Sequence, residues 1–446
     1  MMKTIRGRLV VVIATLGLAS TLLTVPAGAS ATLSGDLTFT AADGAASLTP
    51  AIGGSTFDFP FFSSAIQTYE SAAQNASGAN APTQIPSYGA VGSTSGKKGV
   101  IAGTYAVGAS DVPMGTVSNG VNLDSSLLTN ADAAHTLTSY TQIPVVLGGE
   151  AMMYNLPMLN AKYKKSPVTL TSAVLADIYD GKVTKWNDPK ICHLNPLIAV
   201  VRKNKKGRVV SRRCALPNLA ITPVFRSDGS GTSYIFSNYL NTTQGASYET
   251  SSGTEVYPNT TFNQGQLPSN AVGGYGNPGV ASDVVSKVGA IGYVEYAYVL
   301  IARATGAAVT SALVVNSRGK AVAISPTSVA ADAAAFSSTP PVEGSNGQVS
   351  SFSIVNGNTP GSYPIAGYSW AIVRQDWNGL GTVGSVSASL NSETLVAKFL
   401  DWCVQANGGQ AVAKANGYVP IPSYVTALAE SQIATMTYNK VSLGLS

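Results

Sequence analysis

The sequence predicts an α/β protein with two lobes, and three observations support this fold class. Its 446 residues exceed one ordinary domain and favour two. Hydrophobic residues make up 45% of the chain and charged residues 11%, a balance typical of a globular protein with a large core. Segments with strand character alternate with amphipathic helical segments, which favours parallel strands covered by helices.

The first predicted helix covers residues 59–73. Apolar side chains recur at Phe62, Ile66 and Tyr69, the spacing of one helix face. A Gly-Gly-Ser-Thr turn precedes them, so we expect the helix N-terminus near residues 56–57.

The alternation continues through the middle of the chain. A β-branched run within 142–157 predicts a buried strand. A helix is predicted over 170–186, where Thr171 or Ser172 is the expected cap and Gly181 the expected stop.

The second half contains longer stretches without a clear period. Residues 241–282 are polar and rich in Gly, Asn and Thr, and predict loops with room for a short helix. Residues 285–300 predict a turn and a strand. Residues 301–362 predict irregular structure at a lobe edge or a crossover.

Regular structure returns towards the C-terminus. Residues 362–375 have strand character, and residues 392–406 form an amphipathic pattern that predicts a helix capped by Ser392.

Residues 1–31 have the pattern of a signal peptide. Cationic residues precede an apolar run, and small residues follow it, so cleavage is expected after Ala29 or Ala31. The alternative is a membrane anchor, but Gly17 interrupts the run and Pro26 ends it. We therefore expect an exported protein, in the periplasm or at the cell envelope, that is soluble after cleavage.

Most of the charge signal is local. The leader carries three cationic residues and no acidic ones, so its removal lowers the formal net charge from +5 to +2. Seven of the remaining Lys and Arg residues lie in VRKNKKGRVVSRRC, residues 201–214, which we interpret as an exposed basic hairpin or loop. No aromatic residue interleaves them, so a nucleic-acid partner is not predicted.

The chain has three cysteines and two histidines. Cys192 and Cys214 flank the basic segment and are candidates for a disulfide, whereas Cys403 is expected to be a buried free thiol. Neither His135 nor His193 forms a metal-ligand pattern with them, so neither a metal nor a cofactor is predicted.

The segment ITPVFRSDGSGTSYIFSNYL, residues 221–240, has the features of an anion site. A strand leads into Arg226 and two glycines, and a helix follows, which places backbone N–H groups, hydroxyls and a guanidinium at a helix N-terminus. GGSTFDFPFF and YGAVGSTSGKKG form two further Gly-plus-hydroxyl helix starts. Together they offer the donors that a dehydrated oxyanion needs, although a helix cap is the simpler explanation of each start alone.

The sequence does not match the motifs of two common enzyme classes. GSTSGKK, residues 92–98, has one residue too few between its glycines for a P-loop, and Lys98 stands where Ser or Thr belongs. Ser230 lacks both a Gly-x-Ser-x-Gly elbow and a supported histidine. The motifs therefore predict neither a nucleotide-binding P-loop nor a serine hydrolase.

Nine motifs in sequence resemble the phosphate-binding proteins that serve ABC-type phosphate importers. The likeness covers residues 52–430, through GGSTFDFPF, YGAVGSTSG, VGASDVPM, QIPVVLGGEAMMYNLP, LADIYDGKVTKWNDPKICHLNP, FRSDGSGTSYIFSNYL, VGAIGYVEYAYV, YPIAGYSWAIV and GYVPIP. It implies capture of inorganic phosphate outside the cytoplasm by a monomer, and delivery to the permease subunits of such an importer. Other readings are a binder of a different tetrahedral oxyanion, an exported phosphatase, or a surface protein whose basic insertion binds a wall polymer.

The resemblance also implies a ligand set. The residues that match the phosphate ligands of the family are Thr56, Phe57 through its N–H, Ser93, Asp111, Arg226, Ser230, Gly231 through its N–H, and Thr232, with Asp228 placed to orient Arg226. Asp111 would accept a hydrogen bond from a phosphate that still carries a proton, and would repel sulfate, which carries none.

The fold that the resemblance implies is a two-lobed periplasmic-binding-protein fold of type II, with the ligand in the cleft between the lobes. The expected first lobe comprises residues 32–150 and 351–446, and the second comprises residues 151–350. Two hinge crossovers are expected, near 149–157 and 340–360. The basic insertion, residues 192–214, and the long 241–282 region depart from the family pattern.

Overall fold

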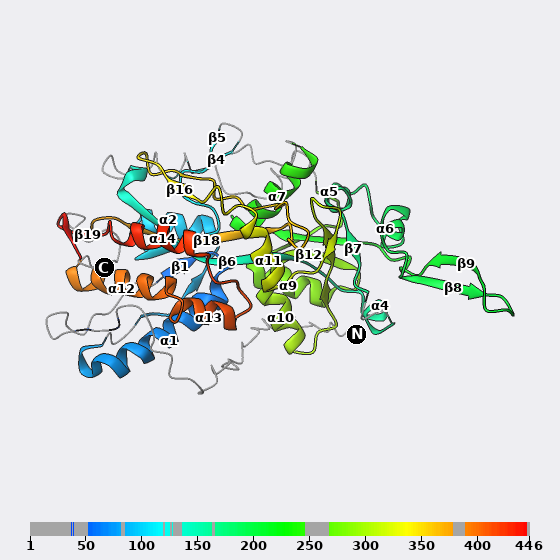
Figure 1. Ribbon diagram of the computed structural model, residues 1–446, viewed down its shortest axis with the longest axis horizontal. Helices are drawn as coiled ribbons and strands as arrows, with labels where there is room; N and C mark the ends of the chain where they lie inside the picture. Colours follow the sequence, from blue (N-terminus) through cyan, green and yellow to red (C-terminus); the bar gives the residue numbers. More distant parts are fainter. Residues whose placement is uncertain are drawn as a thin grey trace, which may run out of the picture. The chain divides into compact units, whose positions relative to one another are not determined.

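The computed structural model describes residues 37, 39, 52–81, 85–118, 121–124, 127, 136–162, 166–245, 267–377 and 389–443 (Figure 1). All of them belong to one compact unit, Leu33–Ser446. The predicted signal peptide and His135 lie outside the described residues.

Strands and helices alternate along the first half of the described chain. Its elements are β1 Ile52–Gly54, α1 Phe59–Ser77, η1 Gly78–Asn80, β2 Gly89–Ala90, α2 Ser93–Ile101, β3 Val107–Ser110, β4 Val117–Ser118, β5 Val121–Asn122, η2 Leu137–Ser139, β6 Tyr140–Tyr154, α4 Pro157–Lys162, β7 Thr169–Leu170, α5 Ser172–Tyr179, α6 Pro189–Leu194, β8 Ala199–Lys203, β9 Val209–Cys214, β10 Thr222–Arg226 and α7 Gly231–Gln244.

The second half continues the alternation. Its elements are β11 Val272–Gly274, α9 Gly276–Ser286, β12 Ala290–Glu295, α10 Tyr296–Ala304, β13 Thr310–Ser311, β14 Leu313–Val315, β15 Ala321–Val322, α11 Pro326–Ala334, β16 Val342–Glu343, β17 Val349–Ser350, β18 Ala366–Arg374, α12 Leu390–Val404, α13 Gly409–Ala415, α14 Ser423–Ile433, β19 Thr437–Tyr438 and β20 Val441–Ser442. The predicted α/β class is confirmed.

The main sheet has the strand order β11-β10-β12-β6-β18-β3-β1-β2, with β13 also paired to β6. Strands β1, β2 and β3 are parallel to one another, and so are β10, β11 and β12. The long strand β6, all 15 residues of it buried, joins the two groups. Its residues 140–149 pair with β18 and its residues 150–154 pair with β12, both antiparallel.

Helices cover both groups of strands, and aromatic side chains fill the layers between. α2 packs on β1 and β3, α9 packs on β10, β11 and β12, and α14 packs on β6. Between α1 and α12, the centroid of the Tyr69 ring lies 5.2 Å from that of the Phe399 ring and 5.4 Å from that of the Trp402 ring. All three rings are fully buried. Burial of such large apolar surfaces is what holds the layers together.

Several predicted elements need correction. Ser392 is not the cap of the C-terminal helix: α12 begins at Leu390, and Ser389 Oγ accepts the hydrogen bond from the Ser392 N–H. Residues 285–300 contain the predicted turn and strand, Ala290–Glu295, but α10 follows the strand at once and was not predicted. Within 301–362 the structure has a regular helix, α11, with a capping box at Ser325. Alanine-rich composition concealed this helix, because its polar face carries few charges to mark a period.

Other predictions are confirmed. β6 covers the predicted strand, and α5 begins after Thr171, whose Oγ1 accepts from the Val174 N–H at 3.3 Å. The basic segment forms an antiparallel hairpin of β8 and β9, and a disulfide joins Cys192 to Cys214. Cys403 is a buried free thiol. Among the described helices, none has both the length and the hydropathy of a membrane span.

Candidate functional site

The predicted ligand residues come together at the ends of parallel strands. Thr56 follows β1, Ser93 follows β2 and Asp111 follows β3, whereas Arg226 ends β10 and leads into α7. In open α/β sheets ligands bind beyond the carboxyl ends of the strands, because the loops and helix N-termini gather there. The main sheet supplies two such edges, one from each group of parallel strands.

Arg226 is the buried cation of this region, and Asp228 holds it. The Arg226 Nε lies 2.8 Å from Asp228 Oδ1, and Nη2 donates to Oδ2, so the guanidinium and the carboxylate form a bidentate pair. Burial alone lowers the pKa of Arg226, but the hydrogen bonds and charge of Asp228 outweigh burial and raise it. The side chain is 1% exposed, so a full positive charge is fixed inside the protein.

Two hydroxyl groups are set up as hydrogen-bond donors. Thr56 Oγ1 accepts from both the backbone N–H and the side-chain Nδ2 of Asn277, at 2.9 and 3.1 Å. Ser93 Oγ accepts from the Gly231 N–H at 3.1 Å and from the Asp111 N–H at 3.4 Å. A hydroxyl with both lone pairs occupied has only its proton left to offer. Both groups can therefore donate to an anion.

Thr232 links Arg226 to Asp111. Its Oγ1 accepts from Arg226 Nη1 and from Asn277 Nδ2, both at 3.1 Å, and donates to Asp111 Oδ2 at 3.3 Å. Asp111 is 2% exposed and is the carboxylate acceptor in a region otherwise rich in donors. A carboxylate at this position can accept a hydrogen bond from a ligand that carries a proton.

The start of α7 brings its backbone close to the network, where the Gly231 N–H donates to Ser93 Oγ. Ser230 caps the helix, its Oγ accepting from the Ser233 N–H at 3.0 Å. A Cβ at Gly231 would lie 2.6 Å from Asp111 Cβ and 2.8 Å from Ser93 Oγ, so only glycine fits between the two strand edges. The Phe57 N–H, at the other edge, donates to Ser55 Oγ at 3.0 Å.

Sequence reasoning missed three members of this network. Asn277 bridges Thr56 and Thr232, as described above. The Oγ of Ser369, on β18, lies within hydrogen-bond distance of both Asp111 Oδ1, at 2.9 Å, and Asp58 Oδ2, at 2.7 Å. Asp58 lies in the motif GGSTFDFPF beside two predicted ligands, which was a usable signal. Asn277 and Ser369 come from distant segments, and only the folded chain brings them here.

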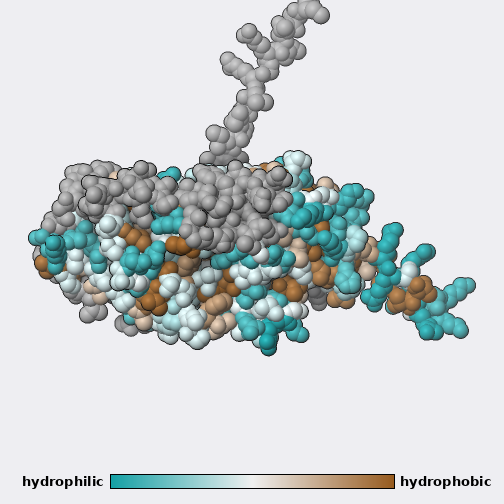
Figure 2. Space-filling view, turned by 90° about the horizontal axis from the view of Figure 1, so that it is seen from above, coloured by the Kyte–Doolittle hydropathy of each residue, from teal (hydrophilic) through white to brown (hydrophobic). Residues whose placement is uncertain are grey.

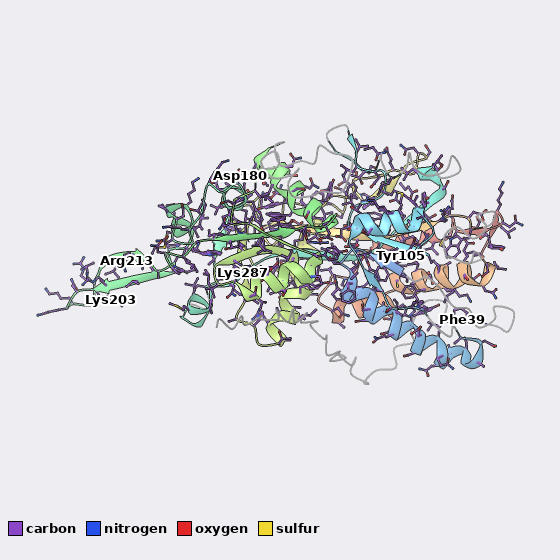
Figure 3. All side chains as sticks on the ribbon, turned by 180° about the vertical axis from the view of Figure 1, so that it is seen from behind. Phe39, Tyr105, Asp180, Lys203, Arg213 and Lys287 are labelled. Atoms are coloured by element: carbon purple, nitrogen blue, oxygen red, sulfur yellow. A yellow bond between two sulfur atoms is a disulfide. The ribbon has the colours of Figure 1, made fainter. Side chains whose placement is uncertain are left out.

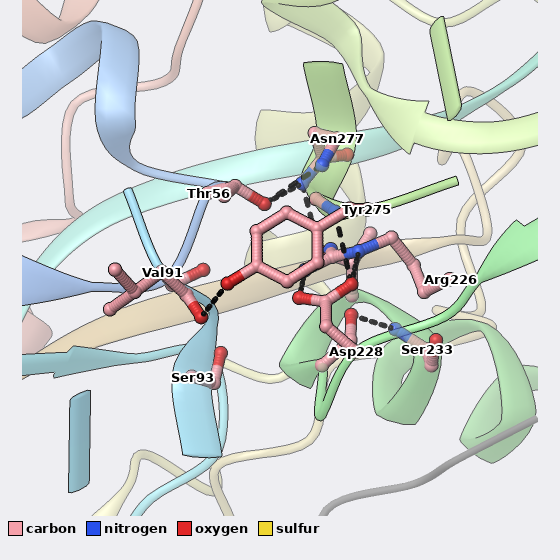
Figure 4. A network of polar contacts seen from close by, with 12 residues as sticks. Thr56, Val91, Ser93, Arg226, Asp228, Ser233, Tyr275 and Asn277 are labelled. Atoms are coloured by element: carbon pink, nitrogen blue, oxygen red, sulfur yellow. Dashed lines mark hydrogen bonds and ion pairs between the residues drawn. The ribbon is translucent and has the colours of Figure 1, made fainter. Parts of the chain in front are cut away.

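Tyr275 lies across the network in Figure 4. Its hydroxyl donates to the backbone oxygen of Val91 at 3.2 Å, so the loop before α9 contacts the loop before α2. Tyr275 is 59% exposed to solvent. The tyrosine therefore reaches the network from its solvent side.

The chemistry available here is binding of an anion. The network offers the hydroxyl protons of Thr56 and Ser93 and the guanidinium of Arg226, together with the carboxylate of Asp111 as an acceptor. His193, the described histidine, lies away from it on α6. Among the described residues, no group of three or more His, Cys, Asp or Glu side chains is placed to hold a metal ion.

Comparisons with known proteins agree with this chemistry. A model of the PBP superfamily domain matches residues 40–407. The phosphate-binding protein PstS of Xylella fastidiosa (strain Temecula1) is 31% identical over 370 residues, which cover 83% of this chain and 80% of that protein. PstS of Haemophilus influenzae is 31% identical over 385 residues, 86% of this chain and 91% of that protein.

A solved structure shares the fold. The periplasmic phosphate-binding protein PfluDING, bound with phosphate, matches with a TM-score of 0.58 at 20% identity. The match covers 85% of this chain and 92% of that one. The fold of this chain is therefore that of the periplasmic binding proteins.

Proposed function

Because the chain belongs to the PstS family of phosphate-binding proteins, we propose that it captures inorganic phosphate outside the cytoplasm and delivers it to the permease of an ABC importer. The members that match it are named as binding proteins, and the residues of the network supply binding groups rather than a nucleophile with its base.

The observation that carries the proposal is the combination of several hydrogen-bond donors with the carboxylate of Asp111. Thr56 and Ser93 have hydroxyl protons to give, Arg226 supplies fixed positive charge, and Asp111 accepts. Near neutral pH phosphate has negative oxygens for the donors and at least one proton for the acceptor. Sulfate has no proton to offer, so Asp111 would face one of its negative oxygens, and this repulsion selects against it.

Binding involves both groups of strands. Thr56, Ser93 and Asp111 follow one group of parallel strands, whereas Arg226 and Thr232 follow the other. We propose that residues 32–150 and 351–446 form one lobe and residues 151–350 the other, and that phosphate favours the conformation in which both contribute ligands. Strand β6 exchanges β18 for β12 as its partner between Gly149 and Glu150, which supports a crossover there.

Calorimetric titration of the mature chain, freed of bound ligand by partial unfolding and refolding, tests the proposal. Phosphate should bind one to one, and sulfate should release no heat at the same concentration. Asp111→Asn should weaken phosphate binding about 10- to 100-fold, the effect of losing a hydrogen bond to a charged group, and should narrow the preference over sulfate. Asp283→Asn, on the outer helix α9, is the matched control. Refolded protein that ignored phosphate would refute the proposal.

A further inference from the structure

We propose that the hairpin formed by residues 199–214, the basic hairpin, is a second interaction surface that docks the protein on an anionic phospholipid bilayer. It extends away from the main sheet and from the network around Arg226 (Figures 1 and 3). The proposal stands on the hairpin alone and holds whatever anion the network binds.

The basic hairpin carries charge of one sign. Its cationic residues are Arg202, Lys203, Lys205, Lys206, Arg208, Arg212 and Arg213, and residues 199–214 include neither Asp nor Glu. All seven are exposed. None of them forms an ion pair with a carboxylate of the described part of the chain. Like charges this close together repel one another, and an external polyanionic partner relieves that cost.

Exposed valines accompany the charges. Val200, Val201, Val209 and Val210 are 41%, 39%, 47% and 61% exposed. In the strand register Val200 pairs with Arg213 and Val201 pairs with Arg212, so an apolar side chain lies beside a guanidinium on each face. Figure 2 shows the result, an apolar patch bordered by hydrophilic residues.

This combination favours a bilayer over a soluble polyanion. A dissolved anionic polymer needs only the cations, and exposed valines add nothing to its binding. The interface of an anionic membrane takes both, because phosphate headgroups attract the cations while the acyl boundary accepts the apolar side chains. Each basic residue near such a surface strengthens binding by about fivefold.

The basic hairpin is also held in shape before it meets a partner. The disulfide between Cys192 and Cys214 fixes its base to α6. At its tip, Asn204 Oδ1 accepts from the N–H groups of Lys206 and Arg208, both at 3.0 Å, and Gly207 takes a φ of +75°. A preorganised surface loses less conformational entropy on binding than a flexible one.

Sedimentation of the mature chain with lipid vesicles tests the proposal. The protein should bind vesicles of phosphatidylcholine mixed with phosphatidylglycerol, and not vesicles of phosphatidylcholine alone. Raising the ionic strength should release it, because salt screens the attraction. Replacing four cations of the tip, Lys203→Gln, Lys205→Gln, Lys206→Gln and Arg208→Gln together, should weaken binding at least about a hundredfold.

Two further variants test whether the position of the charges matters and whether the exposed valines contribute to vesicle binding. A control with the same loss of four charges elsewhere, Lys287→Gln, Arg303→Gln, Arg318→Gln and Lys320→Gln, should bind vesicles within about threefold of the parent. Val201→Ser with Val210→Ser keeps every charge and should weaken binding by about tenfold, the effect of losing apolar burial.

Three results would overturn the proposal. The first is no binding to phosphatidylglycerol vesicles. The second is binding that the hairpin variants leave unchanged. The third is binding to soluble polyphosphate but not to vesicles, which would assign the basic hairpin to a dissolved or wall-bound polymer. Phosphate titration of the same variants should be unaltered, so failure here and failure of the transport proposal are distinguishable.

Discussion

Asp58 and Asp111 meet at a single hydroxyl group, the Oγ of Ser369, which lies 2.7 Å from Asp58 Oδ2 and 2.9 Å from Asp111 Oδ1. One hydroxyl has one proton and cannot donate to both carboxylates. On the far side of Asp58, the Tyr88 hydroxyl lies 2.8 Å from Oδ1 and 2.7 Å from the backbone oxygen of Ser55. Four short oxygen contacts therefore share two hydroxyl protons.

A carboxyl proton relieves this shortage, and Asp58 is the residue that holds it. Asp58 is completely buried, and burial followed by the negative charge of Asp111 raises its pKa well above the ordinary value. Asp111 has Thr232 as a second hydroxyl donor and Arg226 nearby. A neutral Asp58 can donate to Ser369, which then donates to Asp111 and holds it in place.

Asp58→Asn should make the protein more stable at neutral and alkaline pH. A carboxyl whose pKa is raised by folding binds its proton more tightly in the folded state. Its contribution to stability is therefore lost as the pH rises from the ordinary carboxyl range through the raised pKa. Asparagine has no proton to lose. In thermal unfolding between about pH 4 and pH 9, the midpoint temperature of the variant should rise relative to that of the parent as the pH increases. Parallel curves would mean that Asp58 is not protonated.

Asp228→Asn should strongly destabilise the unliganded protein. Removing one partner of a buried pair leaves an uncompensated charge, here on Arg226, at a cost of about 3–5 kcal/mol. The partly exposed pair of Lys190 and Asp177 is the matched control, and Asp177→Asn should cost less than about 1 kcal/mol. Urea unfolding measures both. Similar losses for the two variants would show that the Arg226 charge is solvated rather than held by Asp228.

Sequence reasoning found the candidate binding residues that lie in local motifs, and it missed the members of the network that tertiary contacts bring in. Arg226, Ser230 and Thr232 belong to one strand, turn and helix start, so their proximity follows from seven consecutive residues. Ser369 contacts Asp111 across 258 residues, and Asn277 contacts Thr56 across 221. No local period or cap signal encodes such pairs.

The same limit explains the fold. The strand β6 was predictable because its β-branched run is continuous and buried. Its change of partner from β18 to β12 was not, because it depends on strands that follow much later in the chain. Ser389 was missed as a cap because it lies three residues before Ser392, and both serines suit the position.

Asn277→Ala should weaken phosphate binding about tenfold or more. The variant removes the side-chain donor that occupies a lone pair on Thr56 and one on Thr232. The two hydroxyls are then free to turn, and orienting them again costs free energy on binding. Asn238→Ala removes a partly buried amide on α7 that donates to Ser353 instead, and should leave the affinity unchanged. Calorimetry with phosphate compares the two, and equal affinities would exclude an orienting role for Asn277.

Glu393→Gln should stabilise the protein through a group far from the network. Glu393 lies in the first turn of α12 and is buried, and burial together with the charge of Asp376 raises its pKa to about 9. The folded state therefore favours the neutral acid, and stability falls as the pH rises from about 4.5 towards 9. Glutamine keeps the shape and loses this dependence. At neutral pH the variant should gain at least about 1 kcal/mol in free energy of unfolding. Below about pH 4 the free energy of unfolding of the variant should match that of the parent.

Glu430→Gln, at an exposed position on α14, is the control and should not change the free energy of unfolding at either pH. If Glu393→Gln were instead destabilising at neutral pH, the carboxylate would be ionised in the folded protein and paired with a cation.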